Sequence, residues 1–195
     1  MCDIPTMEDC CWICMDEQDG NVPKQVCGCP RKVHPQCLAR WQLQQAGKQE
    51  ETKCRFCDSQ LLDWKDAFIP DDVKPYYAST TVTMRVIFEG RTYYIKTTSG
   101  EAGKQEFINA IRQLCNIDDD VDFDLNFNVR EPVVDNEIQL FGQGAYDAAI
   151  KCGRIAAAMH RKRETALESQ MPCQLLKNLL RLVRRLMRLS RVYLN

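Results

Sequence analysis

The pattern of hydrophobic and polar residues is most regular in the middle of the chain. Every second residue from Val82 to Phe88 is apolar, and the positions between them are mostly polar. Alternation of this kind is typical of a half-buried strand. The Glu89-Gly90 pair that follows offers a tight turn into a β-rich run over 92–98. We therefore expect a β-hairpin here.

The residues after this hairpin predict a helix, two strands and a second helix. Apolar side chains recur at helical spacing over 103–117 and alternate with Asp and Asn over 121–129. A shorter β-rich run spans 137–141, and small residues at helical spacing fill 145–159. The hydrophobic period therefore changes from two to 3.6 and back along this half of the chain.

The order strand-strand-helix-strand-strand over residues 80–142 is similar to the ubiquitin-like β-grasp fold. The similarity rests on element order and length, without a sequence motif. It implies an α+β domain over 80–163 that binds proteins, either by selecting a substrate or by mimicking ubiquitin. The alternative is a small α+β domain without such a role.

The last stretch, residues 171–195, has the pattern of a basic amphipathic helix. Its leucines recur at spacings of three and four, and its basic residues fall on the opposite side. Over 173–194 such a helix suits an anionic membrane surface, a partner's groove or a coiled coil. It also suits a simpler role, in which its leucines close the core of this chain.

The N-terminal part follows no such period, and its pattern is one of paired metal ligands. Three pairs have two residues between their members and one pair has a single residue. Nitrogen and sulfur ligands in sets of four suit zinc, so eight of them predict two closed structural sites. The pairs are Cys11 and Cys14, Cys27 and Cys29, His34 and Cys37, and Cys54 and Cys57.

The order of the pairs favours an interleaved arrangement over two fingers in series. Only four residues separate Cys29 from His34, too few to hold one finger away from the next. In a cross-brace, the first and third pairs share one ion, and the second and fourth share the other. We therefore expect Cys11, Cys14, His34 and Cys37 on one zinc ion, and Cys27, Cys29, Cys54 and Cys57 on the other.

This stretch resembles the RING fingers, and most closely their RING-CH variant, which carries Cys at the fourth ligand and His at the fifth. Ile13, Leu38 and Trp41 also match the family pattern. The resemblance implies a ubiquitin ligase without a catalytic nucleophile of its own, which binds a ubiquitin-conjugating enzyme carrying ubiquitin. It places Ile13 and Trp41 in the groove that receives the conjugating enzyme, with Leu38 and Pro30 beside them.

The stretch departs from the RING-CH pattern in three places. The loop before His34 is short, Arg55 replaces a frequent proline, and Asp58 stands where active RING fingers often carry a basic residue. The Asp58 departure weakens the expectation of a fast ligase. The short loop also suits a PHD finger that reads histone tails, and a zinc-stabilised interaction scaffold is a further alternative.

Composition adds an expected compartment and a domain plan. The chain has 195 residues and twelve cysteines, seven of them in the ligand pairs. Neither a signal sequence nor an apolar run long enough to span a membrane is evident, so we expect a cytoplasmic protein, with the nucleus as the alternative. The plan is α+β: a zinc finger over 1–68, a linker over 69–79, the β-grasp-like domain and the amphipathic helix.

Charge is distributed unevenly along this plan. Residues 1–80 carry a net charge of −4, residues 81–150 carry −6, and residues 151–195 carry +9. A basic tail on an acidic body favours an anionic partner or internal docking. Aromatic residues are not interleaved with the basic ones, so we expect no nucleic acid. The protein substrate stays unnamed at this level.

Overall fold

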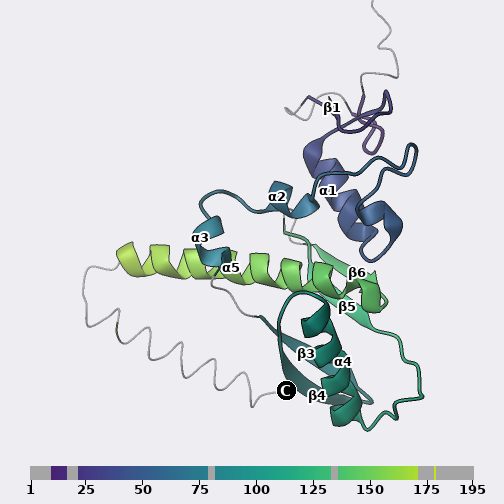
Figure 1. The fold of residues 1–195 in the computed structure, drawn as a ribbon. Coiled ribbons are helices and arrows are strands. Elements are labelled where there is room, and N and C mark those ends of the chain that lie inside the picture. The colour runs from purple at the N-terminus through teal and green to yellow at the C-terminus, as the bar shows by residue number, and fades with distance from the viewer. Residues whose placement is uncertain (1–9, 17–21, 79–81, 133–135, 171–177, 179–195) are drawn as a thin grey trace, which may run out of the picture. The chain divides into compact units, whose positions relative to one another are not determined.

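The computed structural model describes residues 10–16, 22–78, 82–132 and 136–170, together with residue 178 (Figure 1). The chain divides into two compact units, Met1–Ala158 and Met159–Asn195. The amphipathic helix expected over 171–195 lies outside the described residues, apart from position 178. Within the described part, no helix is long and apolar enough to cross a membrane.

The first elements are small and lie among the paired ligands. Strands β1 (Lys24–Gln25) and β2 (Lys32–Val33) pair antiparallel, and α1 (Pro35–Gln44) follows directly. The helix begins at Pro35, which suits the first turn, where no backbone N–H is needed. A 3-10 helix, η1 (Gln49–Glu51), then leads to the last ligand pair.

Gly47 ends the turn after α1. Its φ is +78°, a conformation that side chains with a Cβ rarely adopt. A Cβ here would lie 2.5 Å from the carbonyl carbon of Gly144, so the two backbones approach too closely for a larger residue. This close approach joins the finger to the region that follows it.

Two short helices, α2 (Trp64–Phe68) and α3 (Lys74–Ala78), connect the finger to the strands. The Asp63 side chain accepts a hydrogen bond from the Lys65 backbone N–H and so caps α2. Trp64 and Phe68 are each only 2% exposed, and α2 packs on α1. The segment after the last ligand is therefore part of the core.

The predicted hairpin is present. Strand β3 (Val82–Phe88) pairs antiparallel with β4 (Arg91–Thr97), from Val82 opposite Thr97 to Phe88 opposite Arg91. The two turn residues, Glu89 and Gly90, both have positive φ, as a tight turn between twisted strands requires.

The expected second pair of strands is shorter than the alternation indicates. After α4 (Glu101–Cys115), β5 spans only Asn126–Arg130 and pairs with β6 (Glu137–Phe141). Residues 121–125 form no strand, because β6 is only long enough to pair with β5. The Arg112 guanidinium donates to the carbonyl oxygens of Asp118 and Val121 and fixes the preceding loop instead.

In the described part of the chain, the two hairpins do not join into one sheet. Among the described residues, β3 pairs only with β4, and β5 only with β6. A β-grasp fold requires one continuous sheet across both hairpins, so the resemblance holds for element order and not for sheet topology. The observed class is α+β, with small separate sheets and helices.

Helix α5 (Tyr146–Gln170), preceded by the 3-10 turn η2 (Gln143–Ala145), carries the core of this region. It continues 11 residues beyond the expected end at Met159, since no Gly or Pro interrupts residues 160–170. Tyr146 is 1% exposed, and its hydroxyl donates to the carbonyl oxygens of Thr98, at 2.8 Å, and Gly103, at 3.1 Å. It thereby ties α5 to the loop before α4 and to the first turn of α4.

Candidate metal centre

The first ligand cluster brings together residues from two distant parts of the sequence. Its ligand atoms, from Cys11, Cys14, His34 and Cys37, all lie within 4.8 Å of one another. The Nδ1 atom of His34 lies 3.4 Å from the Cys14 sulfur and 3.7 Å from the Cys37 sulfur. Nδ1 therefore faces the cysteines, while Nε2 is buried without a hydrogen-bond partner among the described residues.

The second cluster consists of four sulfur atoms at similar spacing. The Cys27 and Cys29 sulfurs lie 3.1 Å apart, and each lies 3.5 Å from the Cys54 sulfur. The Cys57 sulfur lies 3.4 Å from that of Cys29. Both clusters therefore follow the interleaved pairing, with the first and third pairs in one group and the second and fourth in the other.

The geometry of both clusters fits zinc. Ligand atoms about 2.3 Å from one zinc ion lie roughly 3.8 Å apart at the corners of a tetrahedron. Six of the ligand pairs, at 3.1–3.7 Å, are near this value, and every pair in each cluster lies within 4.8 Å. The donor sets, three sulfurs with one imidazole and four sulfurs, are those of closed structural zinc sites. The two clusters thus fit two zinc ions.

Each Cys-x-x-Cys knuckle is folded by a local turn with a positive φ at its end. The Met15 N–H donates to the Cys11 carbonyl at 2.8 Å, and the Asp58 N–H donates to the Cys54 carbonyl at 2.9 Å. Met15 and Asp58 occupy the same position after their knuckles and have φ of 59° and 53°. The matching turns direct both sulfurs of a knuckle towards one point.

The thiols of both clusters are crowded and partly shielded from water. Burial raises the pKa of Cys37 to about 12, and the neighbouring Cys27 thiol, together with burial, raises the pKa of Cys29 as well. In contrast, hydrogen bonding with Ser59 lowers the pKa of Cys57 to about 6. A bound cation would stabilise all of these groups as thiolates, so metal binding and folding of this segment are coupled.

These features define a cross-brace finger with two metal clusters of cysteine and histidine ligands. Residues 11–57 match the family model of the RING-variant domain, so this segment is a RING-CH-type zinc finger. The match covers the whole span from the first to the last ligand and favours this family over the PHD alternative. No curated protein and no solved structure matches the chain.

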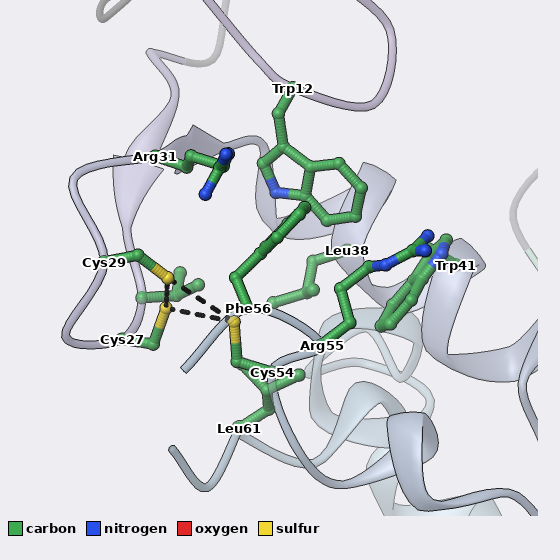
Figure 2. Close-up of a pocket in the computed structure, with 11 residues that line it drawn as sticks. Trp12, Cys27, Cys29, Arg31, Leu38, Trp41, Cys54, Arg55, Phe56 and Leu61 are labelled. Atoms are coloured by element: carbon green, nitrogen blue, oxygen red, sulfur yellow. Dashed lines mark hydrogen bonds between the residues drawn. The ribbon is translucent and has the colours of Figure 1, made fainter. Parts of the chain in front are cut away.

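One face of the finger carries aromatic residues around a shallow depression (Figure 2). Trp12 makes edge-on contacts with Trp41, at a ring separation of 5.6 Å, and with Phe56, at 5.3 Å. The Arg31 guanidinium lies 3.9 Å from the centre of the Phe56 ring. We call Trp12, Trp41 and Phe56 the aromatic surface.

The four residues expected to contact a conjugating enzyme differ in their accessibility. Trp41 is half-buried and lies at the rim of the depression, whereas Leu38 is 6% exposed and lies at its floor. Ile13 is half-buried against the finger core, and Pro30 is exposed in the loop before β2. Trp41 and Leu38 thus line one depression, and Ile13 and Pro30 do not line it.

Trp12 and Phe56 were not among the residues expected from the sequence. Each lies inside a Cys-x-x-Cys knuckle, Trp12 after Cys11 and Phe56 before Cys57. An aromatic residue between two ligands must lie close to the zinc-bound core, and that position is the signal that would have identified both. Phe56 is 44% exposed, so much of its ring is available to a partner.

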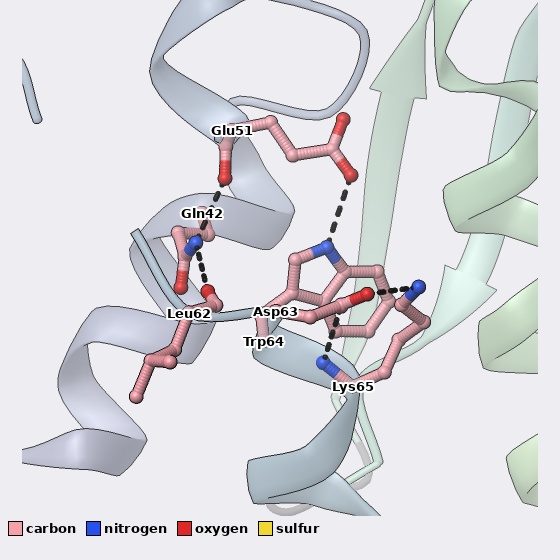
Figure 3. A network of polar contacts seen from close by, with 6 residues as sticks. All are labelled: Gln42, Glu51, Leu62, Asp63, Trp64 and Lys65. Atoms are coloured by element: carbon pink, nitrogen blue, oxygen red, sulfur yellow. Dashed lines mark hydrogen bonds and ion pairs between the residues drawn. The ribbon is translucent and has the colours of Figure 1, made fainter. Parts of the chain in front are cut away.

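A polar network holds the last knuckle against α1 (Figure 3). Gln42 is 2% exposed, and its amide donates to the carbonyl oxygens of Glu51, at 2.8 Å, and Leu62, at 2.9 Å. The Glu51 carboxylate accepts from the Trp64 indole N–H at 3.0 Å and from the Gly47 backbone N–H at 2.8 Å. The network fixes both ends of the segment that carries Cys54 and Cys57.

Proposed function

We propose that this protein is a RING-CH-type ubiquitin-protein ligase. The observation that carries the proposal is the match of residues 11–57 to the RING-variant domain, together with two ligand clusters in cross-brace order. Its partners are a ubiquitin-conjugating enzyme, ubiquitin and a substrate protein. The zinc ions, when bound, hold the finger in shape and take no part in the chemistry.

The finger accelerates transfer by positioning. It holds a conjugating enzyme charged with ubiquitin, so that a substrate lysine attacks the thioester, ubiquitin forms an isopeptide bond with that lysine, and the enzyme's cysteine leaves as a thiol. Proximity and orientation of two bound reactants supply the rate enhancement. No nucleophile from this chain is required.

The aromatic surface supports the binding step of this proposal. Trp41 and Phe56 are large and partly exposed, and both contact Trp12 in the same depression. Aromatic residues of this kind often dominate the binding energy of an interface. Arg31 and Arg55 line the same depression and add positive charge at its rim. Of the four contact residues proposed from the sequence, Trp41 and Leu38 line the depression, and Trp41 is the more exposed of the two, whereas Ile13 and Pro30 lie outside it.

The test is a ubiquitination assay with purified protein, ubiquitin-activating enzyme and a panel of conjugating enzymes. We expect ubiquitin chains with the zinc-loaded protein and none with Cys54→Ser, which removes a ligand of the second cluster. Trp41→Ala should lower the rate at least tenfold while two zinc ions per chain are retained. Tyr94→Ala, which truncates an aromatic residue that is 50% exposed on β4, is the matched control and should leave the rate unchanged.

Two results of this assay would contradict the proposals. If the zinc-loaded protein produces no chains with any conjugating enzyme, the ligase proposal is wrong. If chains form equally well with Trp41→Ala, ligase activity stands but the aromatic surface is not where the enzyme binds.

A further inference from the structure

The proposed function leaves unused a cavity between the two hairpins, outside the finger. A cavity of about 600 Å³ lies between them, bounded by β3 on one side and by residues 123–130 on the other. Helices α4 and α5 contribute the remaining walls, through residues such as Phe107, Ile111 and Ala149. Cavities of this size are in the range of ligand sites.

The strands border this groove along their whole length. All seven residues of β3 and all five residues of β5 line it. These residues include exposed positions as well as half-buried ones. Each of these strands pairs with its neighbour in the hairpin on one side only, so among the described residues its other edge has no strand partner. Two strand edges that pair with no further strand among the described residues therefore border one groove.

The apolar side chains of these strands are also only partly covered. Met84, Val86 and Phe88 of β3 are half-buried, and so are Leu125 and Val129 on the opposite wall. In a closed sheet on two helices, the inward-facing residues would be buried like Ile95 of β4, which is 8% exposed. One missing strand between β3 and β5 would cover these residues and satisfy both edges.

The charge at one end of the groove indicates which kind of side chain a bound segment would carry there. Asp124 lines the groove next to Phe123, whose ring lies 5.1 Å from the guanidinium of Arg112 in the last turn of α4. Cys115, the last residue of α4, lines the groove at this end as well. Glu89 follows Phe88 directly, and burial together with the Glu89 carboxylate raises the pKa of Cys115, so this carboxylate lies near that end as well. The groove is also lined by Arg85, in the middle of β3, and Arg130, at the far end of β5. The two carboxylates therefore favour a basic residue of the occupant at their own end only.

We propose that the groove binds an extended segment of a partner protein by strand addition between β3 and β5. The segment carries apolar side chains at alternate positions, which face α4 and α5, and a Lys or Arg at the end beside Glu89 and Asp124. With a rise of about 3.3 Å per residue, seven residues would run along β3 for roughly 23 Å. Main-chain hydrogen bonds give such complexes affinity, and the alternate side chains give specificity.

In the proposed ligase, such a segment belongs to the substrate, and this assignment rests on the proposed function. Strand addition itself does not require ligase activity. It is therefore tested without any ubiquitin-pathway enzyme, and its failure is distinguishable from failure of the ligase proposal.

The first experiment selects displayed peptides against the full zinc-loaded chain. The probe is a library of random twelve-residue peptides, counter-selected against Ala156→Trp, in which an indole occupies the groove from an exposed position on α5. We expect enriched peptides with alternating apolar residues and a basic end. Their affinity should fall at least tenfold with Ala156→Trp and stay unchanged with Ala166→Trp, a matched exposed position of α5 that does not line the groove.

The second experiment alters the peptide, so the fold of the protein is not at issue. N-methylation of alternate residues on either edge of the selected peptide removes main-chain donors and should weaken binding at least tenfold. Hydrogen exchange measured by mass spectrometry should show that the unmodified peptide protects backbone amides in both β3 and β5. Strand addition requires both results.

Three outcomes would overturn the proposal. One is that no peptide prefers the native chain over Ala156→Trp. Another is that the N-methylated peptides bind as tightly as the unmodified peptide, or that the unmodified peptide protects the backbone amides of only one of the two strands. The third is that the free full chain already protects both free edges, which would mean that another segment of this chain or a second copy fills the groove.

Discussion

The finger and the α+β region after it bury side chains of different kinds. Three of the six residues at the centre of the finger core, Cys11, Cys29 and Cys54, are metal ligands, so ligands make up half of that core. The centre of the α+β region is Tyr146, Ile150 and Ile155, all 1% exposed or less. The finger thus depends on its ions for stability, whereas the second region depends on apolar burial.

Removal of zinc tests this difference most strongly. Structural zinc contributes about 10–16 kcal/mol of apparent binding free energy in small fingers, far more than the finger's apolar core supplies. We therefore expect a strong chelator at neutral pH to remove two zinc ions per chain and unfold residues 11–57. Backbone amides of α4 and α5, measured by hydrogen exchange, should keep their protection.

Equal loss of protection in both regions would contradict this comparison. It would show that the contacts between them, such as the Arg40–Glu131 ion pair and the approach of Gly47 to Gly144, couple the two into one cooperative unit.

The substitution Ile155→Ala tests the other region, because it weakens the apolar core and leaves the zinc ligands in place. Ile155 is fully buried in α5, and truncating a buried isoleucine costs about 2–5 kcal/mol through lost transfer free energy and the cavity left behind. We expect the α+β region to unfold at lower denaturant concentration, with a near-unchanged zinc content of two per chain. Ala156→Ser, at the next and exposed position, should change the midpoint little. Loss of zinc in Ile155→Ala would contradict independent stabilisation.

The two regions also differ in how much the sequence predicts. Ligand spacing identified both clusters, because each knuckle is local and all four side chains of a cluster must reach one ion. Turn residues likewise predicted the β3–β4 hairpin, since Glu89 and Gly90 both adopt positive φ.

Long-range pairing was not predictable in the same way. The alternation over 121–129 suits a strand, yet the bonds from Arg112 and the short β6 decide where pairing starts. Whether two hairpins share a sheet depends on the distance between their edges, which no local pattern encodes. The end of α5 was missed because residues 160–170 change in polarity without any residue that stops a helix.

A smaller effect is expected inside the finger, at Gln42. Replacing it by Leu keeps similar volume but leaves the carbonyl oxygens of Glu51 and Leu62 without their donor in a buried place. Unsatisfied buried groups cost about 1–3 kcal/mol each, so the finger should bind zinc more weakly in a competition titration. Gln44→Leu, at an exposed position of the same helix, is the control. Unchanged zinc affinity in Gln42→Leu would mean that the ions alone fix the last knuckle.

The smallest expected effect is the difference between two glycine-to-alanine substitutions, one in each region. Gly90 has φ of +76° with no atom within 4 Å of an added Cβ, so Gly90→Ala costs only conformational strain, about 1 kcal/mol. At roughly 4–8 °C per kcal/mol for a region of this size, its melting temperature should fall measurably. Gly28, between Cys27 and Cys29, has no positive φ, and a Cβ added there would lie 3.7 Å from the Ser59 hydroxyl oxygen, an ordinary contact distance. Gly28→Ala should therefore leave zinc affinity and stability unchanged. A large loss of zinc affinity in Gly28→Ala would show that the one-residue knuckle tolerates no Cβ, and that backbone conformation constrains the finger as much as its ligands do.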